Sequence, residues 1–242
     1  IWRAASPYFN TVAGSLVRAQ CNLWIFPAQD SWSFMAPVPS LVSIHDLMHR
    51  YERGFPEVSA HGAYFRRERL FRNISRWAKG IIVDSRVGKL HVHESYQVPL
   101  ERIFELAYIP PGYIYETAIS GEFSKKYQLP GKFIFYPAQF WEHKNHTRLV
   151  EAVAKVKTRH PDIFLVLAGA RNNAYDEIRQ KVKTLELSEN VIFLGHVPDH
   201  DMPELYRRAC AMVMPTFFGP TNIPPLEAFA LGCPVAVSNI YG

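Results

Sequence analysis

Residues 213–237, VMPTFFGPTNIPPLEAFALGCPVAV, indicate a buried strand, a loop, a short helix and a second buried strand. Prolines stiffen the loop backbone, whereas Gly219 leaves it free to adopt unusual dihedral angles. A helix N-terminus at this point offers unpaired N–H groups and a partial positive charge, which suit a phosphate. Glu227, which we place in the first turn of this helix, adds a carboxylate that accepts hydrogen bonds from hydroxyls. Phosphate and hydroxyl recognition together point to a nucleotide sugar as the ligand.

The second half of the chain contains short, continuous apolar runs, which are typical of strands buried on both faces of a parallel sheet. Helical patterns separate several of these runs, and the loops between them are short. This alternation predicts a doubly wound α/β sheet. The predicted strands cover 133–136, 163–167, 191–194, 211–214 and 235–237, and the predicted helices cover 147–158, 174–187 and 201–210.

The first half has a similar but less complete pattern. Ser85 is the expected N-cap of a helix that follows the strand at 81–83. Residues 113–131 look like a connector, and we place the domain boundary near residue 122, which gives domains 1–122 and 123–242. We expect the first domain to lack its opening strands and the second its final helices. The other predicted elements of this half are strands at 23–26, 41–44 and 103–109 and a long helix at 61–78.

Composition narrows the class of protein. The net charge of +5 suits anionic ligands but is too diffuse to indicate nucleic acid. The three cysteines are far apart, without metal-ligand spacing, which favours a reduced, cytoplasmic setting and no metal site. No run of 18 apolar residues predicts a membrane span. The basic amphipathic helix at 61–79 fits either a packed helix with a charged outer face or peripheral contact with the inner membrane surface.

Three polar features follow predicted strands, where ligands of open α/β sheets bind. His45-Asp46 follows one strand of the first half, and Asp46 is expected to cap a turn. In the second half, Lys144 and Glu227 follow different strands of one sheet and can meet at its edge. His45 joins them only if the two sheets face each other. Each side chain also has a structural interpretation: a core histidine, a solvated lysine, and a carboxylate that complements the helix dipole.

The combination resembles the retaining glycosyltransferases of the GT-B fold, specifically family four. The resemblance covers about residues 22–239 and rests on five motifs in the same order. They are Ser-Ile-His-Asp-Leu at 43–47, Ile-Ile-Val-Asp-Ser at 81–85, Lys-Asn at 144–145, Val-Ile-Phe-Leu-Gly at 191–195 and Ile-Pro-Pro-Leu-Glu-Ala-Phe-Ala-Leu-Gly-Cys-Pro-Val-Ala at 223–236. This family resemblance implies two Rossmann-like doubly wound parallel-sheet domains.

The resemblance also implies three catalytic residues. Lys144 matches the lysine that neutralises the donor diphosphate, where the departing nucleotide builds negative charge. Glu227 matches the glutamate that binds the ribose hydroxyls. His45 matches a histidine beside the transferred sugar, to which it would donate a hydrogen bond or present its carbonyl.

Further positions match the donor-binding loops of the family. Thr221, Asn222 and Ile223 correspond to the loop whose amides hold the sugar and the phosphate. The backbone from Gly195 to Val197 corresponds to the part that lines the base.

Two departures from the family pattern concern the donor site. Gly219 stands where the family has a first glutamate, so the sugar contact is vacant or passes to Asn222. Gln139 stands near the position of an arginine that binds the diphosphate. His143 or Arg171 would then supply the missing charge.

The sequence therefore predicts a cytoplasmic, metal-independent enzyme. It would move a hexose from a UDP-, GDP- or ADP-sugar to a saccharide or lipid-linked acceptor, with retention and without a cofactor. A sugar-nucleotide epimerase or phosphorylase on the same fold and a non-catalytic nucleotide-sugar-binding module are the alternatives. The vacant positions at Gly219 and Gln139 favour the last of these.

Overall fold

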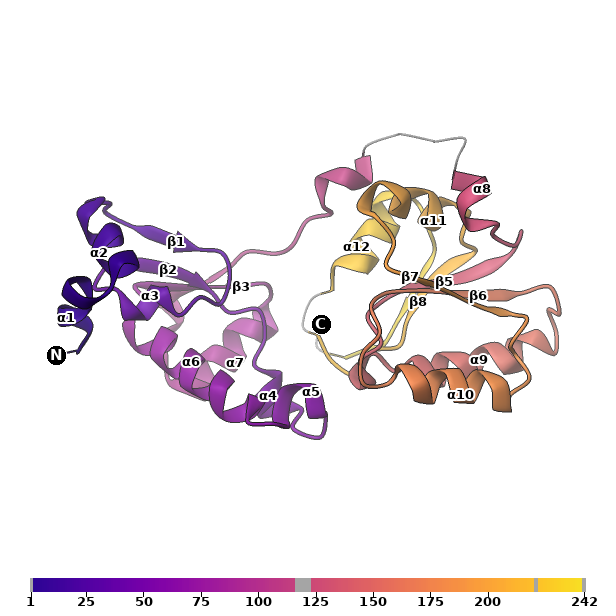
Figure 1. Cartoon of the computed structure of the whole chain (residues 1–242), viewed down its shortest axis with the longest axis horizontal. Helices are drawn as coiled ribbons and strands as arrows, with labels where there is room; N and C mark the ends of the chain where they lie inside the picture. Colours follow the sequence, from indigo (N-terminus) through magenta and orange to yellow (C-terminus); the bar gives the residue numbers. More distant parts are fainter. Residues whose placement is uncertain (1, 116–122, 220–221, 241–242) are drawn as a thin grey trace. The chain divides into compact units, whose positions relative to one another are not determined.

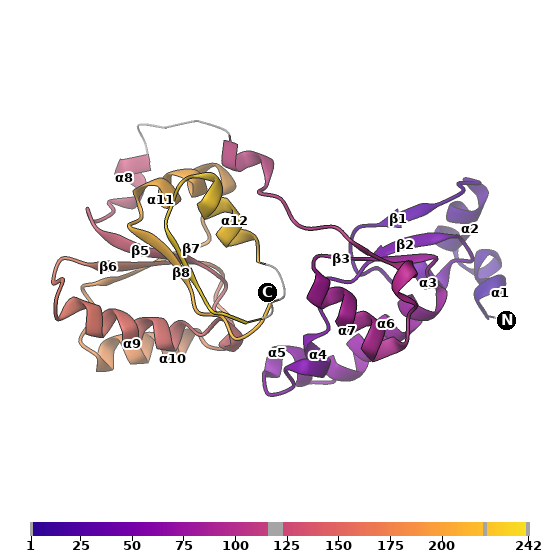
Figure 2. The same ribbon diagram turned by 180° about the vertical axis from the view of Figure 1, so that it is seen from behind.

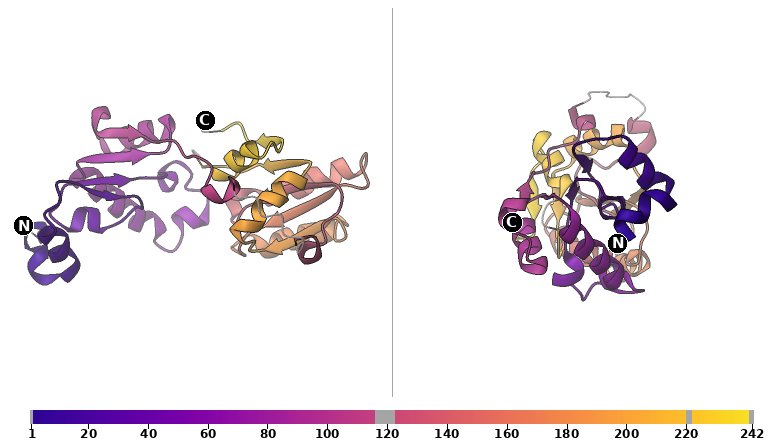
Figure 3. Two further views of the ribbon diagram at one scale, coloured as in Figure 1. Left: turned by 90° about the horizontal axis from the view of Figure 1, so that it is seen from above. Right: turned by 90° about the vertical axis from the view of Figure 1, so that its left-hand side faces the viewer.

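A computed structural model describes residues 2–115, 123–219 and 222–240 of the chain (Figure 1). They form two compact units, which divide between Tyr108 and Ile109. Each unit is a parallel sheet covered by helices, as the sequence predicts. Figure 3 shows the helices and strands of each unit from two further sides.

The first unit contains a four-stranded parallel sheet in the order β1-β2-β3-β4. Helices α6 and α7 lie on one face of this sheet (Figures 1 and 2). The side-chain hydroxyl of Ser85 accepts a hydrogen bond from the Gly88 N–H at 3.1 Å, which confirms it as the N-cap of α7. The strands are β1 (Trp24–Phe26), β2 (Ser40–Ser43), β3 (Gly80–Val83) and β4 (Ile103–Glu105), and the helices are α1 (Trp2–Phe9), α2 (Thr11–Arg18), α3 (Trp32–Met35), α4 (Met48–Tyr51), α5 (Pro56–Ser59), α6 (Ala63–Trp77) and α7 (Arg86–Tyr96).

The basic helix α6 is packed into the first unit. Phe71 and Ile74 of this helix are fully buried beneath the sheet, in one core with Val42 and Ile81. On the polar side, Glu68 accepts two guanidinium hydrogen bonds from Arg50, which ties α6 to α4. These contacts account for the apolar stripe and for part of the charge of α6. The described residues contain no helix long and apolar enough to cross a bilayer.

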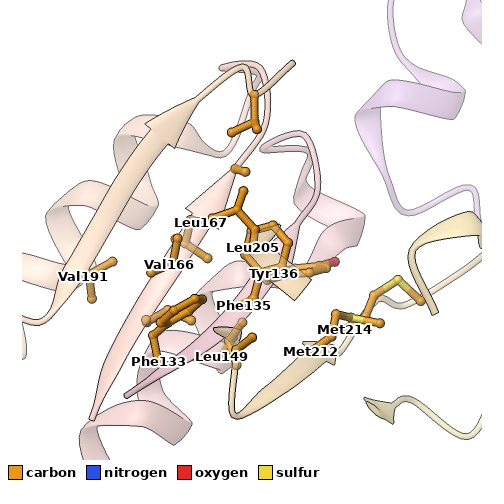
Figure 4. Close-up of a cluster of buried hydrophobic side chains, with 14 of the residues drawn as sticks. Phe133, Phe135, Tyr136, Leu149, Val166, Leu167, Val191, Leu205, Met212 and Met214 are labelled. Carbon is orange, nitrogen blue, oxygen red and sulfur yellow. The ribbon is translucent and has the colours of Figure 1, made fainter. Parts of the chain in front are cut away.

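The second unit contains a five-stranded parallel sheet in the order β7-β6-β5-β8-β9. Helices α9 and α10 lie on one face, and α11 and α12 lie on the other (Figure 2). The buried side chains of β5, β6 and β8 form the centre of the core (Figure 4). The strands are β5 (Phe133–Pro137), β6 (Phe164–Ala168), β7 (Val191–Gly195), β8 (Ala211–Met214) and β9 (Val235–Val237), and the helices are α8 (Phe123–Tyr127), α9 (His146–Lys157), α10 (Tyr175–Thr184), α11 (Met202–Arg208) and α12 (Ile223–Ala230).

The segment predicted as a connector, 113–131, belongs largely to the second unit. Ile114, which is 0% exposed, and Phe123, which is 3% exposed, are both part of its core. Residues 123–127 form helix α8. The units therefore divide earlier than residue 122, because apolar side chains that follow the Pro110-Pro111 pair pack against the second sheet.

Candidate functional site

Two loops meet at the carboxyl edge of the second sheet, after the neighbouring strands β5 and β8. Lys144 ends a short 3-10 turn that precedes α9. Its Nζ donates a hydrogen bond to Asn222 Oδ1 at 3.2 Å, and Asn222 Nδ2 donates one to the Gly219 carbonyl, also at 3.2 Å. The side chain of Asn222 thus joins the lysine to the glycine loop. Lys144 lies beside the N-terminus of α12, as the strand order predicts.

Gly219 is required by the conformation of this loop. Its φ of +128° is in a region that side chains with a Cβ rarely adopt. A Cβ at this position would also lie 2.7 Å from Asn222 Nδ2. The missing glutamate and the placement of Asn222 are therefore linked, because a side chain at 219 would displace the amide that contacts Lys144.

The N-terminus of α12 offers fewer donors than a typical helix. Pro224 and Pro225 carry no N–H, so of the four amide positions that lack an intrahelical partner only those of Asn222 and Ile223 carry a donor. Glu227 is the next residue and lies in the second turn, so our placement of it in the first turn was wrong. The helix begins at Ile223, one turn before the carboxylate. A phosphate at this helix end would therefore depend more on the Lys144 charge than on backbone donors.

Glu227 is 3% exposed, and two tyrosines hold its carboxylate. The hydroxyl of Tyr113 donates to Oε1, and the hydroxyl of Tyr206, on α11, donates to Oε2. Burial, together with this carboxylate, raises the pKa of both tyrosines, which keeps the hydroxyls protonated as donors. Each carboxylate oxygen has a second lone pair for another hydroxyl. Neither tyrosine could be predicted from the local sequence pattern, because neither is near Glu227 in the chain.

A cavity of about 470 Å³ opens beside Glu227. This volume is within the usual range for a bound small molecule. The cavity brings together four predicted site residues, Gln139, Val197, Ile223 and Glu227. Its other lining residues are Pro111, Tyr113, Pro137, Ala138, Ala168, Gly169, His196, Asp199, Met202 and Pro224. Gly195, the last residue of β7, immediately precedes this lining.

Two other predicted donor residues have different surroundings. His143 is 8% exposed, and its ring stacks on that of Phe218 with centroids 3.9 Å apart. It therefore packs against the residue that precedes Gly219. The Arg171 guanidinium lies over the ring of Tyr175. Thr221 lies outside the described residues.

His45 follows β2 in the first unit and is held by a tyrosine at the end of that unit. Tyr108 Oη and His45 Nδ1 are 2.7 Å apart. Asp46 caps a turn as expected, since its Oδ1 accepts a hydrogen bond from the Met48 N–H at 2.9 Å. The same carboxylate pairs with Arg67 of α6. The loop that carries His45 is therefore fixed from both sides.

An Asp-x-Asp tripeptide, a spacing that can hold a metal ion, occurs at residues 199–201. Asp201 is nearly buried and accepts hydrogen bonds from Lys126 Nζ and from the Tyr127 hydroxyl, both at 2.6 Å. It therefore fastens α8 to the turn that precedes α11, while Asp199 lines the cavity. Within the described residues, no three His, Cys, Asp or Glu side chains cluster as metal ligands.

His146, directly after the Lys144 loop, makes the stability of the second unit depend on pH. Burial beside the rings of Tyr136 and Phe140 lowers the pKa of His146 from 6.5 to about 3. Between these two pKa values only the unfolded state takes up the proton. The free energy of unfolding is therefore highest above pH 6.5 and falls as the pH drops toward 3. Between pH 6.5 and pH 5 we expect a loss of about 2 kcal/mol.

His146→Phe keeps an aromatic ring at this position and should remove most of this pH dependence. Urea unfolding at pH 7 and pH 5 measures the difference. The exposed His160→Phe is the matched control and should keep the parent slope. Equal slopes for the parent and His146→Phe would contradict the assignment.

Comparison with known proteins identifies the family. Residues 121–242, half of the chain, match the family model described as glycosyl transferases group 1. The chain belongs to this family. It is 28% identical over 200 residues to O-antigen chain mannosyltransferase RfbU of Salmonella typhimurium, a match that covers 82% of the chain and 52% of the relative. The chain thus spans about half the length of that relative.

Solved structures of glycosyltransferases share the fold, so both units together have the GT-B architecture that the sequence predicted. Anabaena Alr3699/HepE in complex with UDP-glucose superposes with a TM-score of 0.73 at 18% identity, covering 96% of this chain and 64% of that one. WaaG, a glycosyltransferase involved in lipopolysaccharide biosynthesis, gives a TM-score of 0.71 at 19% identity, covering 97% and 65%. At these identities the likeness concerns the fold alone.

Proposed function

We propose that this group 1 family member transfers a hexose from a nucleotide diphosphate sugar to a saccharide or lipid-linked acceptor, with retention and without a metal ion or other cofactor. The observation that carries the proposal is the arrangement around α12. Lys144 is hydrogen-bonded to Asn222 at the start of α12, and the next residue, Ile223, lines a cavity whose carboxylate, Glu227, is held by two hydroxyls. A lysine and a helix N-terminus suit the negative charge of a diphosphate, and a carboxylate suits the hydroxyls of a ribose.

In this proposal Lys144 meets the diphosphate as it departs with its additional negative charge. The dipole of α12 and the Ile223 amide support the same charge. Glu227 accepts hydrogen bonds from the ribose, and its second lone pairs make this compatible with Tyr113 and Tyr206. Asn222, fixed between Lys144 and Gly219, supplies an amide at the position where the family has a glutamate. Membership of the family supports retention.

His45 would act on the transferred sugar, and Tyr108 would set which ring nitrogen carries its proton. Burial raises the pKa of Tyr108, so its hydroxyl stays protonated, and in this proposal it donates to Nδ1. Nε2 then carries the hydrogen and is the donor available to a sugar hydroxyl.

Tyr108→Phe should therefore lower kcat by about 3- to 10-fold, the value of one neutral hydrogen bond, without changing nucleotide affinity. Steady-state transfer kinetics measure kcat, and nucleotide titrations measure the affinity. Tyr115→Phe, an exposed tyrosine, is the control. A loss of nucleotide affinity in Tyr108→Phe would show that the tyrosine acts on the donor site instead.

The direct test uses the purified chain and a panel of UDP-, GDP- and ADP-sugars. A nucleotide or its sugar that binds the folded state raises the thermal midpoint. A bound donor is then incubated with saccharide and lipid-linked acceptors, and the product is analysed for its anomeric configuration. Binding without transfer to any acceptor would favour the nucleotide-sugar-binding module, and inversion would refute the proposed stereochemistry.

A further inference from the structure

The cavity of the second unit contains a carboxylate besides Glu227 that the proposed reaction does not use. Asp199 lines the same cavity, after strand β7. Among the described residues, its carboxylate takes part in no hydrogen bond or ion pair. A negative charge in a site for a nucleotide diphosphate repels the ligand unless it faces a hydrogen-bond donor. The position of Asp199 therefore indicates which part of the nucleotide approaches it.

The order of the strands sets the direction in which the nucleotide lies. Lys144 and the N-terminus of α12 follow β5 and β8, whereas Asp199 follows β7 at the edge of the sheet, beyond β6. A diphosphate beside Lys144, with its ribose at Glu227, leaves the nucleobase to extend toward β7. His196, Val197, Asp199 and Met202 surround that end of the cavity.

Asp199 also lies close enough to Glu227 to act on its partner. Burial and the hydrogen bond to Glu227 are the larger reasons why the pKa of Tyr113 is raised, and the charge of Asp199 adds to them. The turn that carries Asp199 packs against the turn that carries Tyr113. When the ribose of a nucleotide is bound at Glu227, the edge of its nucleobase therefore lies within reach of the Asp199 carboxylate.

The three common bases differ in what they offer a carboxylate. Guanine offers two adjacent donors, N1–H and N2–H, which match both oxygens in a bidentate pair. Adenine offers one amino group flanked by acceptors. Uracil offers a single N3–H between two carbonyl oxygens, which a carboxylate repels.

We propose that the cavity prefers guanine nucleotides over uracil and adenine nucleotides, and that Asp199 is the residue that reads the base. The inference rests on the proposed function, since it names the donor class of the same site. The donor is then a GDP-sugar.

Titration calorimetry with GDP, UDP and ADP, in buffer with EDTA, tests the proposal. The parent chain should bind GDP tighter than UDP and ADP by on the order of tenfold or more. Asp199→Ala should remove this preference by weakening GDP alone. Asp199→Asn should shift it toward UDP, because an amide offers one donor and one acceptor to the matching edge of uracil. Asp176→Asn, on α10 outside the cavity, is the control and should keep the parent pattern.

The outcomes separate this inference from the proposed function. If UDP or ADP binds as tightly as GDP to the parent, or if Asp199→Ala keeps the GDP preference, the inference is wrong while a nucleotide site remains. If none of the three nucleotides binds, the proposed function fails as well. Thermal unfolding of each variant without ligand verifies that the fold is intact.

Discussion

Lys144→Ala should lower the rate of sugar transfer by on the order of 10²- to 10³-fold, the effect of removing one fixed group that stabilises developing negative charge. Nucleotide diphosphate affinity should fall too, since the lysine meets the same phosphates before the reaction. The effect is expected to be large because Pro224 and Pro225 remove two backbone donors from α12. Few other groups at this helix end can replace the lost charge.

Three comparisons sharpen this prediction. Lys155→Ala, an exposed lysine on α9, should leave the rate and the affinity unchanged. Lys144→Arg keeps the charge and should retain more activity than the alanine variant. Asn222→Ala removes the hydrogen-bond partner of Lys144 without removing the charge, so its effect should be smaller. An unaltered nucleotide affinity in Lys144→Ala would place the diphosphate elsewhere.

The local pattern of the chain predicted most of the fold. Continuous apolar runs located most strands to within a residue or two, because strands buried on both faces need uninterrupted apolar side chains. The strand expected at 103–109 is shorter and ends at Glu105. The errors arose where the chain is irregular. The boundary near residue 122 was placed too late, because Ile114 already belongs to the core of the second unit. Helix α12 begins earlier than we expected, at Ile223, which places Glu227 in the second turn.

The candidate site was only partly accessible from sequence. Strand ends identified Lys144 and Glu227, since parallel strands deliver their carboxyl ends to one edge. The tyrosines that hold the site did not follow from any local pattern. Tyr206 reaches Glu227 from a different helix, and Tyr113 reaches it from the segment after the domain division. Such contacts depend on tertiary packing, which spacing along the chain does not encode.

The second large effect is expected from Glu227→Gln, which should weaken nucleotide binding by on the order of 10- to 100-fold. A carboxylate accepts hydrogen bonds at both oxygens, and such charge-assisted bonds contribute about 1.5–3 kcal/mol each. The amide keeps the shape but replaces one acceptor by a donor. That donor faces a tyrosine hydroxyl, so either the tyrosine or the ribose loses its partner. Calorimetric titration with the preferred nucleotide measures the loss.

The two tyrosines distinguish the ligand contact from the positioning of the carboxylate. Tyr206→Phe removes a donor to Glu227 that is buried away from the ligand, so affinity should fall by only about 3- to 10-fold. Tyr127→Phe is the matched control, because that hydroxyl holds Asp201 outside the cavity. In the double variant Tyr206→Phe/Glu227→Gln, the two losses should be less than additive, since both act on one carboxylate. Full additivity would mean that Tyr206 and Glu227 influence nucleotide binding independently. The hydrogen bond between the Tyr206 hydroxyl and the Glu227 carboxylate would then have no part in binding.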